Sequence, residues 1–330
     1  MSQHSSHEIK MYGAIKLYAG SGSPELAQKI ADYLEQQLSP REVIQFPNEN
    51  IFVKLNSSVR GQDVYVIQTT SSPVQYNLME LLIMIQTLQL DSAARITAVV
   101  PYLAYGRSDK KDQPRVPITA RLVADMIEVA GADRYMTFGP HAGQVQGFFS
   151  IPGDVLTSSH LISDHIRDNL FSKMISPVVV ATDLGFAKKG RNYALDLDIP
   201  IAFIEKRRSG NDAQAEALTL IGDVKDRDVI IVDDEVDTGG SIAEAVSVVK
   251  NFGARDVYLV FIHPILSLDA AEKLSELPLK QIITTDTVPI PPEKMKFLDG
   301  KITILSIAPM LGEVIKRAHE GRSVGEMFNE

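Results

Sequence analysis

The segment from Val229 to Ser241 has the clearest chemistry in this sequence, because it combines carboxylates, hydroxyls and paired glycines. It reads Val-Ile-Ile-Val-Asp-Asp-Glu-Val-Asp-Thr-Gly-Gly-Ser. Asp233, Asp234 and Asp237 would repel a bare phosphate, but carboxylates accept hydrogen bonds from sugar hydroxyls and bind metal ions. The Thr-Gly-Gly-Ser turn suits a phosphate, since glycines let a backbone approach closely and hydroxyls donate hydrogen bonds. We therefore expect a site for a phosphorylated sugar.

The flanking residues predict a strand before this segment and a helix after it. Four β-branched apolar residues, 229–232, are typical of a strand buried on both faces of a parallel sheet. Apolar residues at i, i+3, i+4 and i+7 from Ile242 predict a helix up to Phe252, which Gly253 would end. Unpaired N–H groups and the helix dipole favour an anion at such a helix start. The alternative is a solvated turn with acids that cap the helix.

Composition narrows the function classes. A chain of 330 residues predicts one large or two ordinary domains. The net charge of −9 argues against nucleic acid or an anionic membrane as a general partner, and zero cysteines exclude thiolate catalysis and Cys-ligated zinc. The sequence contains neither a transmembrane-length apolar run nor a signal-peptide core, so we expect a soluble, cytoplasmic protein. No G-x-G-x-x-G motif follows a strand, which disfavours dinucleotide binding, and no Walker A motif occurs, which disfavours a P-loop nucleotide site.

Short β-branched runs alternate with longer amphipathic stretches, which predicts an α/β fold with mainly parallel sheets. The predicted strands are 15–18, 64–68, 95–100, 134–138, 178–182, 201–205, 229–232, 257–262, 281–284 and 302–306. The predicted helices are 24–38, 77–88, 118–130, 159–170, 241–252, 270–276 and 309–319. The rhythm restarts after Pro152. We therefore expect a loose tail over 1–10, a first domain over 11–156 and a second over 157–330, whose extreme C-terminus could pack back on the first.

Two further predicted strands lead to residues that could bind a metal ion or a phosphate. His141 follows strand 134–138 among small residues, and Asp183 directly follows strand 178–182. Ligands of open α/β sheets bind at the carboxyl ends of strands, so His141 could hold Mg²⁺ or phosphate and Asp183 a metal ion. From these residues alone, a merely packed His141 and an Asp183 that only caps a turn explain the pattern equally well.

Three cations, Lys206 to Arg208, end the predicted strand 201–205 and lead into the polar segment 209–216, which predicts a mobile loop. Cations that close over a phosphate site can neutralise the charge that develops during phosphoryl transfer. A solvated basic turn is the usual interpretation of a lone charge run. The other anion-related motifs favour the catalytic interpretation here.

The first half offers two weaker signals for a nucleotide. Arg107 lies in a charged, aromatic loop after strand 95–100 and could bind phosphate or stack on a purine, although a solvated surface arginine fits equally well. Phe46-Pro-Asn-Glu-Asn50 offers an aromatic face and amides for a nucleobase. Without further support, an ordinary turn is the better interpretation of that segment.

Taken in order, these segments resemble the ribose-phosphate diphosphokinases, also called phosphoribosyl-diphosphate synthetases. The resemblance runs from Lys16–Ser23 to Ser323–Phe328, and its most specific segments are Asn77–Met84, His141–Phe149, Lys206–Arg208 and Asp233–Ser241. It implies two tandem type I phosphoribosyltransferase-like domains, each with a mainly parallel sheet flanked by helices. It also implies transfer of the diphosphoryl group of Mg-ATP to the C1 hydroxyl of ribose 5-phosphate, which gives 5-phosphoribosyl 1-diphosphate and AMP.

The resemblance further implies a role for individual residues and a set of partners. Ribose 5-phosphate would bind at Asp233, Asp234, Asp237, Thr238, Gly239, Gly240 and Ser241. Catalysis would involve Lys206, Arg208 and His141; the metal, Mg²⁺, would be held by His141 and Asp183; and ATP by Phe46, Asn48, Arg107, Asp112 and His141. Phe46 and Asn48 would reach a neighbouring subunit's site, since the family forms dimer-based hexamers. ADP and phosphate would be regulators, and neither nucleic acid nor membrane would be a partner.

The sequence departs from the family pattern at five positions. Gly139 stands where the family usually has Asp, Phe186 where it has Gly, Ser108 where it has Gln, Asn50 where it has Glu and Tyr76 where it has Asp. A lost carboxylate at position 139 would weaken the outer shell of the metal. Loss of such an outer-shell partner typically lowers metal affinity or activity by roughly 10–100-fold. Asn50 and Ser108 leave the nucleotide preference open.

Two alternatives compete with the synthetase interpretation. A non-catalytic, synthetase-associated regulatory subunit would be expected to lose the cations at 206–208 or the acid pair, and this chain keeps both. A phosphoribosyltransferase would share the loop at 233–241. The cations and the ATP-like motifs of the first half argue against that second alternative.

Overall fold

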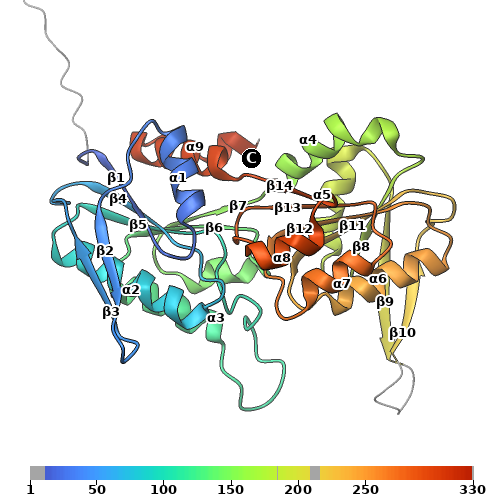
Figure 1. Ribbon diagram of the computed structural model, residues 1–330, viewed down its shortest axis with the longest axis horizontal. Coiled ribbons are helices and arrows are strands. Elements are labelled where there is room, and N and C mark those ends of the chain that lie inside the picture. The colour runs from blue at the N-terminus through green and yellow to red at the C-terminus, as the bar shows by residue number, and fades with distance from the viewer. Residues whose placement is uncertain (1–11, 184, 209–215, 329–330) are drawn as a thin grey trace, which may run out of the picture. The chain divides into compact units, whose positions relative to one another are not determined.

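The computed structural model describes residues 12–183, 185–208 and 216–328, which form two compact units. Unit 1 comprises the chain up to Thr137, Ala142–Val155 and the chain from Ala308 onward, and unit 2 comprises Phe138–His141 and Leu156–Ile307. Each unit has its own mainly parallel sheet with flanking helices (Figure 1). The α/β class expected from the sequence is confirmed. None of the helices in the described part of the chain is long and apolar enough to span a membrane.

Unit 1 is built on a five-stranded sheet of order β1-β4-β5-β6-β7. Its strands are β1 (Ile15–Ala19), β4 (Asp63–Ile67), β5 (Arg95–Val100), β6 (Arg134–Phe138) and β7 (Gly153–Leu156). Its helices are α1 (Pro24–Tyr33), α2 (Val74–Leu90), α3 (Thr119–Ala130), α9 (Ala308–Glu320) and the 3₁₀ turns η1 (Gly143–Phe148) and η3 (Gly325–Phe328). β4 and β5 are fully buried, as expected for parallel strands covered on both faces. Helices α2 and α3 lie on one face of the sheet and α1 and α9 on the other (Figure 1).

A β-hairpin of β2 (Arg41–Gln45) and β3 (Ile51–Leu55) was not predicted. Both strands are short and largely exposed, and no two-residue turn of the Asn-Gly type joins them. The turn expected at 46–50 closes this hairpin, because the Phe46 N–H donates to the Asn50 carbonyl (2.8 Å). The hairpin places Phe46 and Asn48 at its tip.

A buried charge cluster attaches the C-terminal helix α9 to the sheet of unit 1. Asp63 is fully buried and receives a bidentate pair of hydrogen bonds from Arg95, at 2.7 and 2.6 Å. His319 Nδ1 of α9 lies 2.8 Å from the same carboxylate, and Arg95 also donates to the Ala318 carbonyl (3.1 Å). The chain terminus is therefore held by charge-assisted bonds at the amino ends of β4 and β5.

We expect Arg95→Met to lower the free energy of unfolding by about 3–5 kcal/mol, because it leaves the buried Asp63 carboxylate without its main cation. Arg121→Met is the matched control, since Arg121 forms an exposed helical ion pair with Asp125. Its loss should cost at most about 1 kcal/mol. Urea unfolding of both variants compares them, and equal losses would contradict the assigned weight of the buried cluster.

Unit 2 is built on a seven-stranded sheet of order β10-β9-β8-β11-β12-β13-β14, parallel except for the β9–β10 pair. Its strands are β8 (Val178–Ala181), β9 (Ile201–Arg208), β10 (Glu216–Ile221), β11 (Val229–Val236), β12 (Val257–Pro264), β13 (Gln281–Thr285) and β14 (Ile302–Leu305). Its helices are α4 (Ser159–Asn169), α5 (Ala187–Leu197), α6 (Gly240–Asn251), α7 (Ala270–Glu276), α8 (Pro292–Leu298) and the 3₁₀ turn η2 (Phe171–Lys173). Helices α4 and α5 bury one face of the sheet and α6 and α7 the other (Figure 1).

The strand order of unit 2 reverses between β8 and β11. From β8 the chain moves outward through α5 to β9 and β10, and it then returns to form β11 on the other side of β8. Connections that leave in opposite directions open a crevice at the carboxyl ends of the two strands, where ligands of such sheets bind. The described strands of the unit 1 sheet instead follow chain order from one edge to the other. The fold therefore directs attention to the ends of β8 and β11.

Several elements of unit 2 differ from the sequence expectations. The prediction ended one strand at Val232, but β11 continues to Val236 because β12 pairs with it up to Pro264. Likewise β9 runs to Arg208, paired with β10. Of the segment predicted as a mobile loop, residues 209–215 lie outside the described residues and Glu216 begins β10. Helices α5 and α8 were missed, the first because Gly190 interrupts a polar sequence.

Candidate active site

Two adjacent carboxylates, Asp233 and Asp234, lie in β11 beside the end of β8. Asp233 accepts a hydrogen bond from the Thr182 hydroxyl (2.9 Å) and another from the backbone N–H of Asp234 (2.8 Å). Thr182 directly follows β8, so its hydrogen bond joins the carboxyl ends of the two strands at the point where the strand order reverses. The acid pair is thus fixed at the crevice by the sheet itself.

Asp234 is nearly fully buried, with 3% of its surface exposed, and its carboxylate interacts with two side chains of unit 2. Its Oδ2 atom lies 2.7 Å from His141 Nδ1 and 3.7 Å from Lys189 Nζ. An ionised carboxylate can only accept, so His141 Nδ1 carries the proton of this hydrogen bond. The sequence left open whether His141 is packed in the core; its side chain is 39% exposed and lies against the acid pair.

The surroundings of the two acids shift their pKa values in opposite directions. Burial, followed by repulsion from Asp234, raises the pKa of Asp233 well above its ordinary value. Burial also opposes ionisation of Asp234, but the hydrogen bond with His141 and the charge of Lys189 outweigh it and lower the pKa of that carboxyl. The pair thus combines a firmly ionised carboxylate with a carboxyl that retains its proton more readily.

The phosphate-binding residues predicted at 238–241 form the start of α6. Gly239 is the N-cap residue, in the left-handed conformation at φ +77°, and no side chain caps the helix. Thr238, Gly240 and Ser241 are exposed at this end. Uncapped N–H groups at the positive end of a helix dipole are suited to an anion, as phosphate would be.

The loop before α6 is held in place by the segment that follows β12. The Leu266 N–H donates to the Val236 carbonyl (2.8 Å), and the Ser267 N–H donates to the Asp237 carbonyl (2.9 Å). Asp237 is partly exposed between the acid pair and the helix start. Residues 233–241 therefore form one continuous, backbone-anchored edge along the crevice.

We expect Gly239→Ala to lower the free energy of unfolding by about 1–2 kcal/mol, because a side chain disfavours the left-handed conformation. Space is not the reason, since the nearest atom to an added Cβ is 3.8 Å away. Gly240→Ala is the control for stability, as Gly240 has an open Cβ position and lies in the helix. Urea unfolding should separate the two variants, and equal stabilities would show that the loop adapts.

Asp183 lies one residue after Thr182, past the end of β8. It is exposed, and its Oδ1 atom accepts a hydrogen bond from the Phe186 N–H (2.7 Å) just before α5. The capping role considered from the sequence is therefore present in the structure. A cap does not preclude a metal role, because a carboxylate has several acceptor positions.

His141 and Asp183 fit a magnesium ion that is mainly held by its substrate. A metal-binding histidine almost always bonds its second ring nitrogen to a carboxylate or carbonyl, and Asp234 gives His141 Nδ1 such a partner. Mg²⁺ is usually bound by one or two protein ligands together with substrate phosphates and water. The described residues contain no group of three or more His, Cys, Asp or Glu side chains arranged as a metal site.

The remaining predicted residues fall into two places. Lys206 and Arg208 lie in β9, where their backbones pair with Leu218 and Glu216, and their side chains are outside the description. Of the candidate ATP-binding residues, Phe46, Asn48, Arg107 and Asp112 are exposed and belong to unit 1, whereas His141 belongs to unit 2. Phe46 is 45% exposed and its ring is 6.2 Å from that of Phe52. The predicted metal, catalytic and ribose 5-phosphate residues are therefore all in unit 2, and the ATP residues are divided between the units.

The surroundings of position 139, where the family usually has Asp, leave little room for a side chain. Gly139 has φ +37°, and an added Cβ would lie 2.7 Å from Ile262 Cδ1. Its carbonyl lies 3.4 Å from Nε2 of the buried His263, whose Nδ1 is 2.9 Å from the Thr287 hydroxyl. The space that a larger residue would need is therefore occupied by apolar packing.

We expect His263 to make stability depend on pH. Burial lowers the pKa of His263 to about 4, against about 6.5 unfolded, so the unfolded chain binds the proton more readily. Its contribution to stability is therefore complete above pH 6.5 and is lost as the pH falls to about 4, by at most about 3 kcal/mol. His263→Asn should flatten this part of the stability curve, measured by urea unfolding from pH 7 to 4. The exposed His160, changed to Asn, should retain the slope; an unchanged slope in His263→Asn would refute the assignment.

Ser108 and two other departures have local explanations in unit 1. The Ser108 hydroxyl accepts a hydrogen bond from the Thr119 N–H at the start of α3 (3.2 Å), which closes the loop that carries Arg107 and Asp112. Asn50 and Tyr76 both line a groove of about 410 Å³ between the hairpin and the start of α2. Phe186, the fifth departure, is buried beside α5, with Lys189 Nζ 5.5 Å from its ring.

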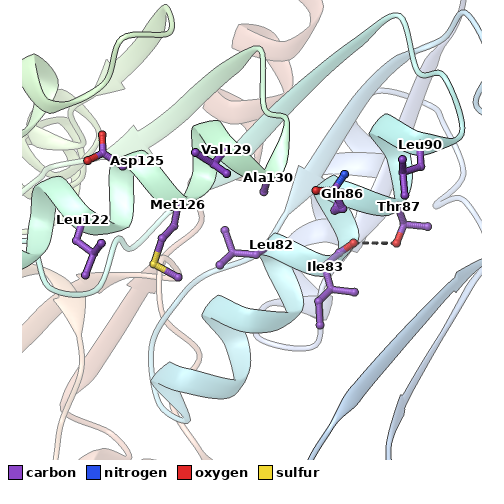
Figure 2. Close-up of a pocket in the computed structure, with 10 residues that line it drawn as sticks. All are labelled: Leu82, Ile83, Gln86, Thr87, Leu90, Leu122, Asp125, Met126, Val129 and Ala130. Carbon is purple, nitrogen blue, oxygen red and sulfur yellow. Dashed lines mark hydrogen bonds between the residues drawn. The ribbon is translucent and has the colours of Figure 1, made fainter.

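A groove of about 580 Å³ between α2 and α3 lacks comparable chemistry. Figure 2 shows its lining, which is mostly aliphatic, with Asp125 as its charged residue. Asp125 is paired with Arg121 of the same helix. Thr87 in turn donates its hydroxyl proton to the Ile83 carbonyl (2.8 Å). The polar groups are thus engaged locally, and the groove offers no charged cluster for an anion.

An acid pair followed by an open helix start, at the crevice of an α/β sheet, defines a protein that holds a phosphorylated sugar. Comparisons with known proteins agree with this class. Residues 15–131 match the N-terminal domain of ribose phosphate pyrophosphokinase, and residues 211–329 match the phosphoribosyl synthetase-associated domain. The chain belongs to the ribose-phosphate pyrophosphokinase family, and the resemblance inferred from the sequence is confirmed.

Individual relatives span nearly the whole chain. The ribose-phosphate pyrophosphokinase of Caldanaerobacter subterraneus is 43% identical over 96% of this chain and 98% of its own length. That of Aquifex aeolicus is 41% identical over 95% and 99%. A crystal structure of phosphoribosylpyrophosphate synthetase from Mycobacterium smegmatis superposes with a TM-score of 0.88 at 39% identity, covering 94% of this chain and 100% of that one. The expectation of an enzyme is thereby confirmed.

Sequence reasoning overlooked three side chains that contact the predicted residues. Thr182 bonds Asp233, Lys189 approaches Asp234, and His263 lies against Gly139. Lys189 had a usable signal, because Gly190, Tyr193, Ala194 and Leu197 lie at helical spacing and are all buried. Recognising α5 would have placed Lys189 in the helix that follows Asp183.

Proposed function

We propose that this chain, a ribose-phosphate pyrophosphokinase by family, transfers the diphosphoryl group of Mg-ATP to ribose 5-phosphate through the crevice of unit 2. The observation that carries the proposal is the continuous edge 233–241, in which an acid pair leads into an uncapped helix start. The products are AMP and 5-phosphoribosyl 1-diphosphate, and the latter is a starting material for nucleotide biosynthesis. The activity follows from family membership; the residue roles below rest on the geometry of the site.

Ribose 5-phosphate binds along this edge. The 5-phosphate sits on the N–H groups and hydroxyls at the start of α6, supplied by Thr238, Gly239, Gly240 and Ser241. The sugar hydroxyls donate to Asp233, Asp234 and Asp237, and the firmly ionised Asp234 is the strongest acceptor. Because the loop backbone is already anchored, little reorganisation is needed when the sugar binds.

Charge near the transferring group is balanced by a metal ion and by cations. His141 and Asp183 would hold Mg²⁺, which when bound neutralises the phosphate oxygens of ATP. Lys206 and Arg208 stabilise the charge that spreads over those oxygens in the transition state. The attacking group is a hydroxyl of the sugar, so positioning and electrostatics carry the catalysis without a covalent enzyme intermediate.

The nucleotide is assigned to residues of unit 1. Arg107 and Asp112 hold ATP from the loop after β5, and Phe46 and Asn48 reach the site of a neighbouring copy from the hairpin tip. Their exposure to solvent in a single chain supports that assignment. We therefore propose a homo-oligomer of the dimer-based hexamer type, located in the cytoplasm, with ADP and phosphate as regulators.

Two other functions are less well supported. A non-catalytic regulatory subunit would not need the His141–Asp234 hydrogen bond or the acid pair, and this chain has both. A phosphoribosyltransferase would share the 233–241 edge but would have no use for an ATP site. Neither alternative is favoured by relatives at about 40% identity over the full length.

Product identification tests the proposal directly. The protein is mixed with Mg²⁺, ATP and ribose 5-phosphate in the presence of inorganic phosphate, and the products are separated by anion-exchange chromatography. We expect AMP and 5-phosphoribosyl 1-diphosphate in equal amounts. Binding of ribose 5-phosphate without AMP formation would instead support a regulatory relative.

We expect Lys206→Ala to lower kcat by about 100-fold or more while KM for ribose 5-phosphate changes little, because the cation acts on the transition state. Steady-state kinetics with each substrate varied in turn measures both constants. Lys188→Ala, the loss of an exposed cation to which we assign no role, is the control. An unchanged kcat in Lys206→Ala would remove this lysine from the catalytic residues.

A further inference from the structure

Lys189, on the first turn of α5, binds the chain segment that carries His141. Its Nζ atom donates to the Pro140 carbonyl (2.7 Å) and to the His141 carbonyl (3.1 Å), and it lies 3.7 Å from Asp234 Oδ2. One ammonium group therefore contacts both the backbone of His141 and the carboxylate to which the His141 side chain is bonded. Two of the three ammonium donors thus bond backbone carbonyls, while the positive charge also forms an ion pair with Asp234.

The segment that Lys189 binds needs an anchor, because it is short and its neighbours in sequence belong elsewhere. Phe138–His141 is part of unit 2, whereas the chain up to Thr137 and the chain from Ala142 are part of unit 1. The Gly139 N–H bonds the Leu156 carbonyl (2.8 Å), and the Gly139 carbonyl lies 3.4 Å from His263 Nε2. The Pro140 and His141 carbonyls, which follow Gly139, both accept hydrogen bonds from Lys189.

Lys189 also acts on the electrostatics of the pair. Its ammonium lies 3.7 Å from Asp234 Oδ2, so its positive charge faces the carboxylate that His141 bonds. The same carboxylate oxygen lies 2.7 Å from His141 Nδ1 and so holds the orientation of the ring. The Lys189 side chain is 35% exposed, and its Nζ atom also lies 5.5 Å from the centre of the Phe186 ring.

We propose that Lys189 is a positioning residue for diphosphoryl transfer: it holds the Pro140–His141 backbone and the Asp234 carboxylate so that His141 keeps one orientation. The proposal rests on the function proposed above, in which His141 helps to hold Mg-ATP. It predicts that Lys189 affects the step that uses the metal and ATP. Ribose 5-phosphate is bound mainly through its 5-phosphate at the start of α6, so its KM should change less than kcat, although Asp234 also accepts from the sugar.

Three variants test the proposal in the full-length protein. Lys189→Met keeps an aliphatic stem but removes the hydrogen-bond donors and the positive charge. Lys189→Arg keeps the donors and the charge. Lys188→Met is the matched control, because Lys188 is the exposed neighbour on the same helical turn. Thermal unfolding of each variant first establishes that it is folded; if Lys189→Met is not, Lys189→Gln takes its place.

We expect Lys189→Met to lower kcat by roughly 10–100-fold and to raise the Mg²⁺ concentration needed for half-maximal rate, with a smaller change in KM for ribose 5-phosphate. Lys189→Arg should recover most of the rate, and Lys188→Met should behave as the unsubstituted protein. A kcat for Lys189→Met within about twofold of the unsubstituted value, or an arginine variant as impaired as the methionine variant, would overturn the proposal.

A second readout does not depend on activity. The Nδ1–H proton of His141, bonded to Asp234, should give a downfield proton NMR signal, which His141→Asn assigns by its disappearance. We expect this signal in the unsubstituted protein and in Lys189→Arg, and its loss or broadening in Lys189→Met. If the protein made no AMP, the proposed function would fail, while this signal would still decide whether Lys189 positions His141. A signal that persists in Lys189→Met would refute the positioning role.

Discussion

A buried carboxylate is the constraint on which the site of unit 2 depends. Leaving an ionised group such as Asp234 unpaired in the interior would cost several kcal/mol, so the structure must bring opposite charge and hydrogen-bond donors to it. Those donors come from distant parts of the chain, since His141 follows β6 and Lys189 belongs to α5. The need to satisfy one acid thus joins residues separated by about a hundred positions in sequence.

The sheet of unit 2 makes this pairing possible because it reverses its strand order at the right place. β8 and β11 are neighbours although two strands and a helix separate them in sequence. Their parallel pairing brings Thr182 beside Asp233 and orients the loop into α6 along the same edge. The sheet of unit 1 is similar in composition but is wound in one direction, which explains why similar strands there do not produce a similar acid site.

Much of this arrangement could be predicted from the sequence, but only where one local pattern determined the outcome. The buried strand 229–232, the start of α6 and the acids between them were read from hydrophobic periodicity and glycine placement. The extension of β11 to Val236 could not be, because it depends on pairing with β12 up to Pro264. The partner of His141 could not be predicted for the same reason, because no local pattern relates His141 to Asp234, which lies 93 residues away in sequence.

The departures from the family pattern illustrate a related limit. Gly139 suggested a missing carboxylate, and the sequence alone offered no means to tell whether something replaced it. The structure shows two adjacent residues of β12 against Gly139, with Ile262 in the volume that a side chain would need and His263 facing the Gly139 carbonyl. The surroundings of position 139 thus come from a strand distant in sequence, which no local pattern reveals.

The division of the chain between the two units has a consequence for how the protein can be taken apart. The path changes unit after Thr137, after His141, after Val155 and after Ile307. A polypeptide that stopped at Val155 would lack α9, and with it the His319 and Ala318 partners of Asp63 and Arg95. A polypeptide that began at Leu156 would lack His141. No single cut yields two complete halves, so gene fusion, fragment complementation or domain exchange in this protein must move both units together.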